Sequence, residues 1–229
     1  MIEDPPLLTL RRNFPRPTAE QLAAFADVPT GFLVDAMKGR GALHHRIKPI
    51  DDDKARFHGT AITCDNGPAD NLGAFCAIEV AAPGDVVLAA ADGFEATAVS
   101  GDLMLGMAKN KGVAAFVTDG LVRDITGIRE VGMPCFAAGV TPNSPVRNGP
   151  GTVGQPIVIG GVAADAGDIV VGDMDGVVVV PHAKIDGVIG ALTDIRAAEK
   201  EMDAKVRSGM ATAPFITDFF ASGRIQEID

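Results

Sequence analysis

The feature that most constrains the fold is a series of short apolar runs between Val86 and Val180, each bounded by glycine or aspartate. The runs are Val86–Ala90, Ala114–Thr118, Cys135–Ala138, Ile157–Ile159, Ile169–Val171 and Val177–Val180. Near-continuous apolar runs of this length are typical of strands whose two faces are both buried. Between the first two runs, Leu103–Lys111 carries one apolar helical stripe that ends before Gly112. This alternation predicts a mixed α/β domain with a buried sheet.

Upstream of these runs, the sequence predicts two further helical regions and one strand. Thr18 and Gln21 have the spacing of a capping box at the start of a helix. Pro29 interrupts that pattern, and we expect Thr30 to cap a second helix over Gly31–Lys38. Residues 57–64 alternate like a strand, and Asn71–Ala81 reads as a short helix.

Two segments of the chain resemble each other weakly. Pro83-Gly84-Asp85 and Ala166-Gly167-Asp168 each precede a buried apolar run that ends at an Asp-Gly pair. Both therefore predict a turn that enters a strand and a turn that leaves it, within one domain. After Gly209, an amphipathic helix around Phe215 and Phe219 presents an apolar face, and we expect it to dock on a neighbouring subunit.

Charge and composition exclude several classes of function. With 20 Lys and Arg against 30 Asp and Glu, the net charge is −10, and no basic run is present, so we expect no nucleic-acid partner. The longest apolar stretches fall far short of the roughly 20 residues of a membrane span, and no signal peptide is evident. Three cysteines without CxxC spacing are typical of free buried thiols, and the four histidines show no metal-ligand spacing. The sequence thus predicts a cytoplasmic protein without a membrane partner.

Residues Gly149–Gly154 satisfy the GxGxxG pattern of dinucleotide-binding loops. That pattern binds pyrophosphate only between a strand and a helix. Here the preceding residues are predicted to be loop, and Gln155-Pro156 leads into a strand, so we interpret the glycines as a loop without nucleotide.

Ser100-Gly101-Asp102 precedes the predicted helix Leu103–Lys111. The first amides of that helix, on Leu103 and Met104, have no intrahelical partner and lie at the positive end of the helix dipole. They suit a small anion such as a carboxylate. The alternative is that Asp102 or Ser100 only caps the helix.

A second polar cluster, Thr118 to Gly127, follows the strand Ala114–Thr118 at the end where α/β sheets collect ligands. Arg123 and Asp124 form a simple surface ion pair in one interpretation. In the other, Asp124 is an oxygen ligand of a divalent metal and Arg123 is a fixed cation beside it. Mg²⁺ takes only one or two protein carboxylates, so Asp124 together with Asp102 would suffice.

Gly101-Asp102, then twenty residues, then Arg123-Asp124 and Gly127, resembles the signature of the class II pyruvate aldolases, the 4-hydroxy-4-methyl-2-oxoglutarate/4-carboxy-4-hydroxy-2-oxoadipate aldolases grouped with the ribonuclease E regulator RraA. The resemblance extends from about Thr30-Gly31 through Pro83-Gly84-Asp85 to Asp173–Pro181. It implies an RraA-like α/β domain of the swivelling β/β/α type with N- and C-terminal helices. We therefore expect one domain over 1–229, with a core at about 30–190 and helices at 191–229 that dock on a neighbouring subunit of a homotrimer or homohexamer.

The resemblance also implies roles for individual residues. Asp124 would bind Mg²⁺ or Mn²⁺ directly, Asp102 would bind it through water, and Arg123 would contact the keto oxygen of the substrate. The amides of Leu103 and Met104, after Gly101, would hold the pyruvate carboxylate. Two further roles complete the set, namely a substrate-binding role for Arg147 and a carboxylate from a neighbouring subunit, for which Glu199 is the candidate and Glu201 the alternative.

The implied reaction is metal-dependent aldol cleavage of a 4-hydroxy-2-oxoacid to pyruvate and a second 2-oxoacid, accompanied by decarboxylation of oxaloacetate. A divalent cation and Arg123 would stabilise the enolate left when the C3–C4 bond breaks. The alternatives are a dedicated oxaloacetate decarboxylase and a non-catalytic regulator of ribonuclease E. Asp102 favours catalysis, because the regulators are expected to lack that acid.

Overall fold

The computed structural model describes residues 6–228. Residues 1–5 lie outside the described residues, so the expectation that no signal peptide is present falls on a segment that is not described. The chain divides after Leu192 into two compact units, and α6 (Ile185–Arg207) begins in the first and ends in the second. No helix within residues 6–228 is long and apolar enough to cross a membrane.

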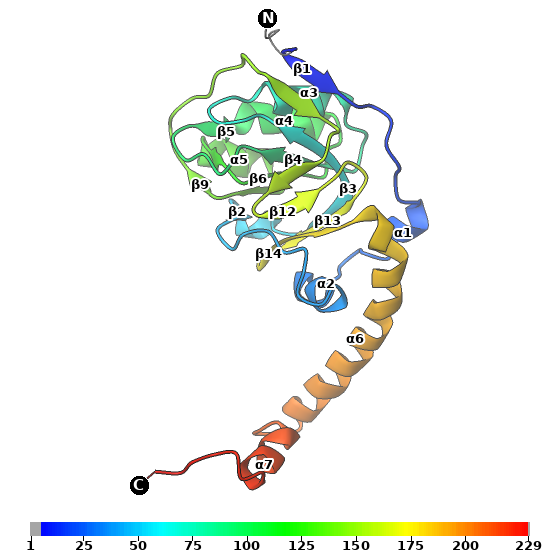
Figure 1. Cartoon of the computed structure of the whole chain (residues 1–229). Helices are drawn as coiled ribbons and strands as arrows, with labels where there is room; N and C mark the ends of the chain where they lie inside the picture. Colours follow the sequence, from blue (N-terminus) through cyan, green and yellow to red (C-terminus); the bar gives the residue numbers. More distant parts are fainter. Residues whose placement is uncertain (1–5, 229) are drawn as a thin grey trace, which may run out of the picture. The chain divides into compact units, whose positions relative to one another are not determined.

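A mixed sheet forms the centre of the first unit (Figure 1). Its parallel part contains β3 (Phe57–Asp65), β4 (Asp85–Ala90), β6 (Ala115–Thr118) and β8 (Cys135–Ala137), in that order. The short antiparallel strand β2 (Lys48–Pro49) pairs with β8 at the end of the sheet. These apolar strands lie where the sequence predicts them, which confirms the mixed α/β fold.

The other edge of β3 has two antiparallel partners in succession. Its first half pairs with β13 (Ile169–Asp173), which forms a hairpin with β14 (Gly176–Val180). Its last two residues pair with β10 (Gly151–Val153), and β10 pairs in turn with β1 (Leu8–Leu10). Strand β10 lies inside the GxGxxG segment, so our interpretation of these residues as a loop was wrong. No helix follows β10; the chain continues into the small hairpin β11 (Ile157–Ile159) and β12 (Val162–Ala164).

Alternate residues of the parallel strands pack on opposite faces of the sheet. Val87 and Ala89 face the helices α3 (Leu72–Val80), α4 (Asp102–Asn110) and α5 (Ile125–Val131). Val86 and Leu88 face the opposite layer, which includes the β11–β12 hairpin. Burial on both faces explains why the strands read as continuous apolar runs.

The N-terminal helices pack against the β13–β14 hairpin and the first residues of α6. The capping box of α1 (Ala19–Ala23) forms as predicted, with reciprocal hydrogen bonds between Thr18 and Gln21. The expectation that Thr30 caps the second helix was wrong. Thr30 is the first residue of α2 (Thr30–Ala36), and its amide and hydroxyl both donate to Asp173 at 2.8 Å.

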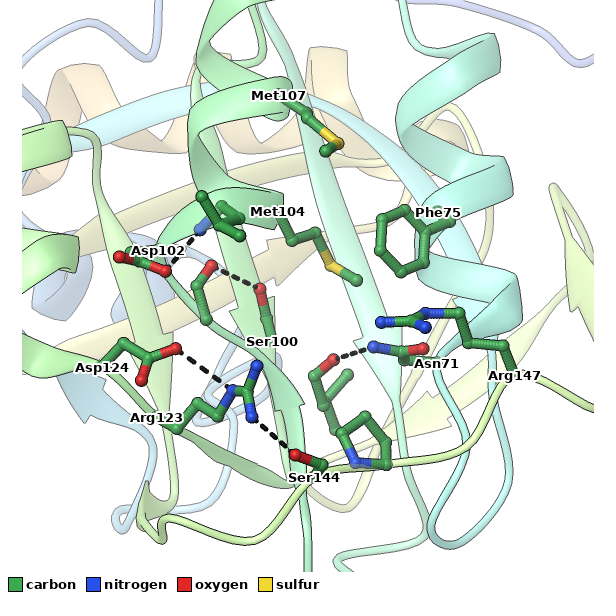
Figure 2. Close-up of a pocket in the computed structure, with 14 residues that line it drawn as sticks. Asn71, Phe75, Ser100, Asp102, Met104, Met107, Arg123, Asp124, Ser144 and Arg147 are labelled. Carbon is green, nitrogen blue, oxygen red and sulfur yellow. Dashed lines mark hydrogen bonds and ion pairs between the residues drawn. The ribbon is translucent and has the colours of Figure 1, made fainter.

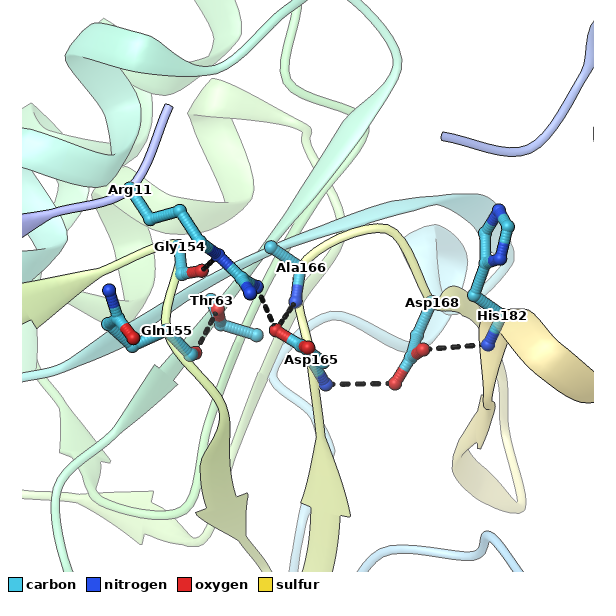
Figure 3. Close-up of polar contacts among 8 residues, drawn as sticks. All are labelled: Arg11, Thr63, Gly154, Gln155, Asp165, Ala166, Asp168 and His182. Atoms are coloured by element: carbon cyan, nitrogen blue, oxygen red, sulfur yellow. Dashed lines mark hydrogen bonds and ion pairs between the residues drawn. The ribbon is translucent and has the colours of Figure 1, made fainter. Parts of the chain in front are cut away.

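The resemblance between residues 83–85 and 166–168 has a structural basis. Gly84 and Gly167 both have positive φ, and the aspartate after each accepts a hydrogen bond from the amide three residues before it. Figure 3 shows the second case, in which Asp168 also accepts from the amide of His182. The shared turn therefore anchors the start of each strand.

A separate three-stranded parallel sheet positions the polar residues of interest. Strands β5 (Ala98–Ser100), β7 (Leu121–Val122) and β9 (Gly139–Val140) pair side by side. Each follows one strand of the parallel part of the large sheet, because β5 comes after β4, β7 after β6 and β9 after β8. The chain segments that leave these three strands therefore emerge at the same edge.

The second unit contains the end of α6 and α7 (Pro214–Ala221). Glu201 and Asp203 form ion pairs with Lys205 and Arg207, one turn later on α6. The helix predicted after Gly209 is present as α7, with Phe215 and Phe220 exposed. That this unit docks on a neighbouring subunit stays a prediction.

Candidate active site

A pocket with a cavity of about 180 Å³ lies where β5, β7 and β9 end. It is lined by residues from the segments that follow these three strands, together with residues at the start of α3 (Figure 2). Seven of the residues that the sequence predicts for the site line it: Gly101, Asp102, Leu103, Met104, Arg123, Asp124 and Arg147. Glu199, the candidate from a neighbouring subunit, lies on α6 in the second unit, and its role stays a prediction.

Asp124 links the end of β7 to the start of α5 in an unusual backbone conformation. Its φ of 62° lies in the left-handed region, which costs a non-glycine residue about 1 kcal/mol but which aspartate tolerates better than most. Although Asp124 is the N-cap residue of α5, its side chain makes no capping hydrogen bond. The carboxylate instead lines the pocket, so the local structure presents this group to a ligand.

Arg123 is held at two points. Its Nε lies 3.1 Å from Oδ2 of Asp124, and its Nη1 donates to the hydroxyl of Ser144 at 2.6 Å. The predicted ion pair between Arg123 and Asp124 therefore exists, and it lies at the pocket instead of on an unrelated surface (Figure 2). Because both side chains remain about 40% exposed, the pair contributes little to stability but fixes a cation beside a carboxylate.

Asp102 is the first residue of α4, and the N-cap position belongs to Gly101, which has no side chain to cap with. The Oδ1 atom of Asp102 accepts from the amide of Leu103 at 2.7 Å. Within the described chain, the amide of Met104 makes no hydrogen bond. The helix start thus offers one free amide, and the second becomes available to an anion only if the Asp102 carboxylate moves.

Two glycines allow the carboxylates to sit close to the backbone. A Cβ on Gly101 would lie 2.5 Å from Oδ2 of Asp124, and a Cβ on Gly127 would overlap the carboxylate of Asp102. Both glycines belong to the pattern read from the sequence. The structure shows the physical reason, because any side chain at either position would displace one of the two acids.

Asn71, Phe75 and Ser144 are among the pocket residues that were not predicted from the sequence. Asn71 and Phe75 lie at the start of α3, and Ser144 lies in the loop after β9. None belongs to a motif. The only signal was that the helix Asn71–Ala81 begins with a polar residue, which by itself indicates a helix start and not a site.

The donor set fits a hard divalent cation of the Mg²⁺ type. Asp102 and Asp124 supply two carboxylates at one pocket, and within residues 6–228 no group of three or more His, Cys, Asp or Glu side chains could hold a metal ion. Two carboxylates match what Mg²⁺ takes from proteins, since it keeps several waters and takes other oxygens from the substrate. The set is too small for a structural zinc site.

The cysteines do not contribute a nucleophile to this site. Cys64, Cys76 and Cys135 are all free, and none lines the pocket. Burial raises the pKa of the Cys135 thiol to about 12 and also raises the pKa of the Cys64 thiol. Both buried groups are therefore uncharged thiols at neutral pH, as expected for packing residues.

Comparisons with known proteins show which family this chain is similar to. A profile of the RraA-like family, described as Aldolase/RraA, matches residues 30–179. A protein of Halalkalibacterium halodurans, provisionally named a 4-hydroxy-4-methyl-2-oxoglutarate aldolase, is 36% identical over 81% of this chain and 86% of its own. An uncharacterized protein of Methanocaldococcus jannaschii is 32% identical over 71% of this chain and 79% of its own.

Solved structures show the same fold. Streptomyces coelicolor RraAS2, described as an unusual member of the RNase ES inhibitor RraA family, superposes with a TM-score of 0.74. It is 27% identical, and the match covers 83% of this chain and all of that one. The RNA-processing inhibitor RraA of Thermus thermophilis has a TM-score of 0.62 and 30% identity, over 68% of this chain and 93% of that one.

Proposed function

This chain belongs to the RraA-like (Aldolase/RraA) family, and we propose that it is a metal-dependent pyruvate aldolase that cleaves 4-hydroxy-2-oxoacids to pyruvate and a second 2-oxoacid. The observation that carries the proposal is the convergence of Asp102, Arg123 and Asp124 on one pocket. The provisional aldolase name of the Halalkalibacterium halodurans relative supports the same reaction class.

In this proposal Asp124 would bind Mg²⁺ or Mn²⁺ directly, and Asp102 would bind the same ion through water. The bound cation supplies Lewis acidity to the 2-oxo group of the substrate. The amide of Met104, at the positive end of α4, binds the carboxylate next to that group. The amide of Leu103 donates to Oδ1 of Asp102 and so helps to hold that acid at the start of α4.

Arg123 stabilises the charge that develops during cleavage. When the C3–C4 bond breaks, its two electrons pass to C3 and are delocalised onto the C2 oxygen, while the C4 hydroxyl loses its proton and C4 becomes a carbonyl carbon. Ser144 and Asp124 hold the guanidinium in place before the substrate binds, so little reorganisation is needed as the oxyanion forms. We assign both proton transfers to Asp102, which would take the proton of the C4 hydroxyl as the bond breaks and then return a proton to C3, yielding pyruvate.

The same enolate forms when oxaloacetate loses CO₂, so we expect oxaloacetate decarboxylation as an accompanying activity. The second candidate function is regulation of RNA processing, which the description of the Thermus thermophilis RraA structure brings into consideration. Catalysis is favoured here because Asp102 lies at the same pocket as the Arg123–Asp124 pair, whereas a surface that only binds a protein does not need a second acid there.

The test is the substitution Asp124→Ala in the full-length protein. We expect loss of pyruvate release with an unchanged circular dichroism spectrum, because the carboxylate makes no capping hydrogen bond and is partly exposed. Leu103→Ala is the matched control, since its exposed side chain lines the same pocket but the proposed chemistry uses only its amide. Near-normal activity of the Asp124→Ala protein would refute the proposal.

A further inference from the structure

Asn71 has a buried polar atom that the proposed chemistry does not use. The residue lies at the start of α3, lines the pocket and is only 4% exposed. Its Oδ1 is the one buried side-chain nitrogen or oxygen in residues 6–228 without a hydrogen-bond partner. An unpaired buried acceptor is destabilising, so it indicates that a ligand with a hydrogen-bond donor binds at this point of the pocket.

The orientation of the Asn71 amide is fixed by its other end. Nδ2 donates to the carbonyl of Val99 at 2.9 Å, and a carbonyl can only accept. Turning the amide over would place two acceptors against each other, so the oxygen cannot exchange places with the nitrogen. Figure 2 shows the oxygen at the end of the amide away from this bond, on the side where Arg147 lies.

The start of α3 does not need this oxygen for its own stability. An asparagine at the N-cap position ordinarily accepts a hydrogen bond from a helix amide, but Asn71 makes no such bond. The preceding residue, Asp70, takes that place and accepts from the amide of Leu72 at 2.8 Å. Its other oxygen accepts from the amides of Asn148 and Gly149, at 2.6 and 3.0 Å. Asp70 therefore holds both the helix start and the loop after β9, and Oδ1 of Asn71 is left for a ligand.

Arg147 supplies donors beside this acceptor. Its guanidinium lies over the Phe75 ring, 5.1 Å from the centroid, and forms no ion pair with any described residue. The backbone amide of Asn71 donates to the carbonyl of Val146, so Asn71 and Arg147 come from adjacent segments. This part of the pocket thus presents an oxygen that can only accept and a guanidinium that can only donate.

A hydroxyl group matches both sides at once, because it donates one hydrogen bond and accepts others. A carboxylate would satisfy Arg147 but would place its own acceptors against Oδ1 of Asn71, and a methyl group would satisfy neither. The hydroxyl on C4 is not this group, since in the proposed reaction its single proton passes to Asp102. The match therefore requires a further hydroxyl, on a carbon beyond C4.

We propose that Asn71 determines specificity for a hydroxyl beyond C4, with its Oδ1 accepting from that group and Arg147 donating to it. The inference rests on the proposed function and adds a substrate class, the 2-oxo-3-deoxy sugar acids, which carry hydroxyls on C4 and on the carbons that follow. The same C3–C4 bond breaks, its electrons pass to C3, and the proton of the C4 hydroxyl passes to Asp102. C4 leaves as the carbon of an aldehyde, so the second product is a hydroxyaldehyde. The hydroxyl bound to Asn71 keeps its proton throughout.

The first test measures binding with two probes that cannot be cleaved, N-(2-hydroxyethyl)oxamate and N-propyloxamate. Both keep the carboxylate and the neighbouring carbonyl of a 2-oxoacid, an amide nitrogen replaces C3, and they differ only in a terminal hydroxyl against a terminal methyl group. Affinities come from isothermal titration calorimetry of the full-length protein with excess Mg²⁺. We expect the wild-type protein to prefer the hydroxyl probe by about ten-fold, the effect of one hydrogen bond to a buried acceptor.

Variants of Asn71 show whether this residue causes the preference. Asn71→Leu keeps a side chain of similar size without the acceptor, and Asn71→Ala is a second variant that adds no bulk; we expect the preference to disappear in both. The control Asn143→Leu removes a similar amide, whose Nδ2 donates to the carbonyl of Ala96 at 2.9 Å, from an exposed position outside the pocket. The control should keep the preference. A change in general packing would weaken both probes equally and leave their ratio unchanged.

The second test measures the activity in the direction of synthesis, which passes through the same transition state. Pyruvate is offered with glycolaldehyde or with propanal, which differ in a hydroxyl against a methyl group. Because the two aldehydes differ in intrinsic reactivity, the ratio of their kcat/KM values is compared between wild type and Asn71→Leu. We expect the ratio of glycolaldehyde to propanal to fall by about ten-fold in the variant.

The inference is overturned if the wild-type protein binds both oxamates equally or binds neither, or if both Asn71 variants retain the wild-type ratio. Its failure is distinct from failure of the proposed reaction, because the binding experiment needs no turnover. Equal binding of the two probes by a protein that cleaves 4-hydroxy-2-oxoacids would leave the aldolase and refute the hydroxyl site. A preference that depends on Asn71, in a protein that neither forms nor breaks the C3–C4 bond, would refute the aldolase and uphold the hydroxyl site.

Discussion

The substitution Gly127→Ala is expected to separate activity from stability. Gly127 lies inside α5 with an ordinary helical backbone, where alanine is favoured over glycine by about 0.5–1 kcal/mol. An added Cβ, however, would lie 2.7 Å from Cβ and 2.8 Å from Cγ of Asp102, and closer still to its Oδ2. Carbon atoms pack at about 3.5–4.0 Å, so Asp102 must move by about 1 Å.

The two effects on stability oppose each other. Overpacking costs about 1–3 kcal/mol in a rigid core, but Asp102 is only half-buried and can rotate away from the new methyl group. The helix gain and the residual strain should nearly cancel, leaving a change in unfolding free energy of about 1 kcal/mol or less and a melting temperature within about 2–4 °C of wild type. Misplacement of a reacting group by about 1 Å lowers kcat/KM by about 100-fold.

Coupled pyruvate release measures the activity, and far-ultraviolet circular dichroism measures unfolding, because the chain has no Trp or Tyr. Gly106→Ala is the matched control, since Gly106 lies inside the neighbouring helix α4 and its Cβ would meet nothing within 4 Å. We expect the control to keep full activity and gain stability. Wild-type kcat/KM in a folded Gly127→Ala protein would refute the argument that Asp102 must hold this position.

Two predictions concern stability. Asp85 is only 2% exposed and accepts two hydrogen bonds from Arg16, at 2.6 and 2.8 Å. The substitution Arg16→Met leaves this buried carboxylate without its partner, so it should lower the unfolding free energy by about 2 kcal/mol in urea titrations. A change near zero would contradict this prediction. Burial raises the pKa values of Asp119 and Asp168 above the ordinary value of 3.8, so each carboxyl group loses its proton at a higher pH in the folded protein than in the unfolded protein. Their contribution to the unfolding free energy is therefore greatest below pH 3.8 and falls as pH rises through the raised pKa values. NMR titration should find both pKa values above 3.8, and a pKa at or below 3.8 would contradict the argument.

Much of the fold could be predicted because its main strands are buried on both faces and carry an uninterrupted apolar signal. The turn before Asp85 recurs before Asp168 for one physical reason, and the sequence shows it. The strands β5, β7 and β9 could not be predicted, because runs of two or three residues carry no periodicity and exist only through pairing with one another. Strand β10 was missed for the same reason, since its glycine-rich sequence is held in the sheet by β1 and β3.

The candidate site was predictable where its residues are neighbours in sequence. Gly101-Asp102 and Arg123-Asp124 each lie at the junction between a strand and the helix that follows it, so local patterns identify them. Asn71, Phe75 and Ser144 are distant from these pairs in the sequence. They meet at the pocket because of the path of the loop between β9 and β10, and that path depends on hydrogen bonds to residues 69–71. Thr30 was misjudged because a hydroxyl at a helix start usually caps that helix, whereas here Asp173, distant in the sequence, takes both of its hydrogen bonds.

The most direct test of the central claim is pyruvate release from 4-hydroxy-4-methyl-2-oxoglutarate, 4-carboxy-4-hydroxy-2-oxoadipate and oxaloacetate, each assayed with Mg²⁺ and again with excess EDTA. Coupling to lactate dehydrogenase reports pyruvate continuously. The account predicts release from at least one of the hydroxy acids that stops with EDTA and returns when Mg²⁺ is added in excess. Release from oxaloacetate alone, release that persists in EDTA, or no release by the folded, metal-supplied protein would contradict it.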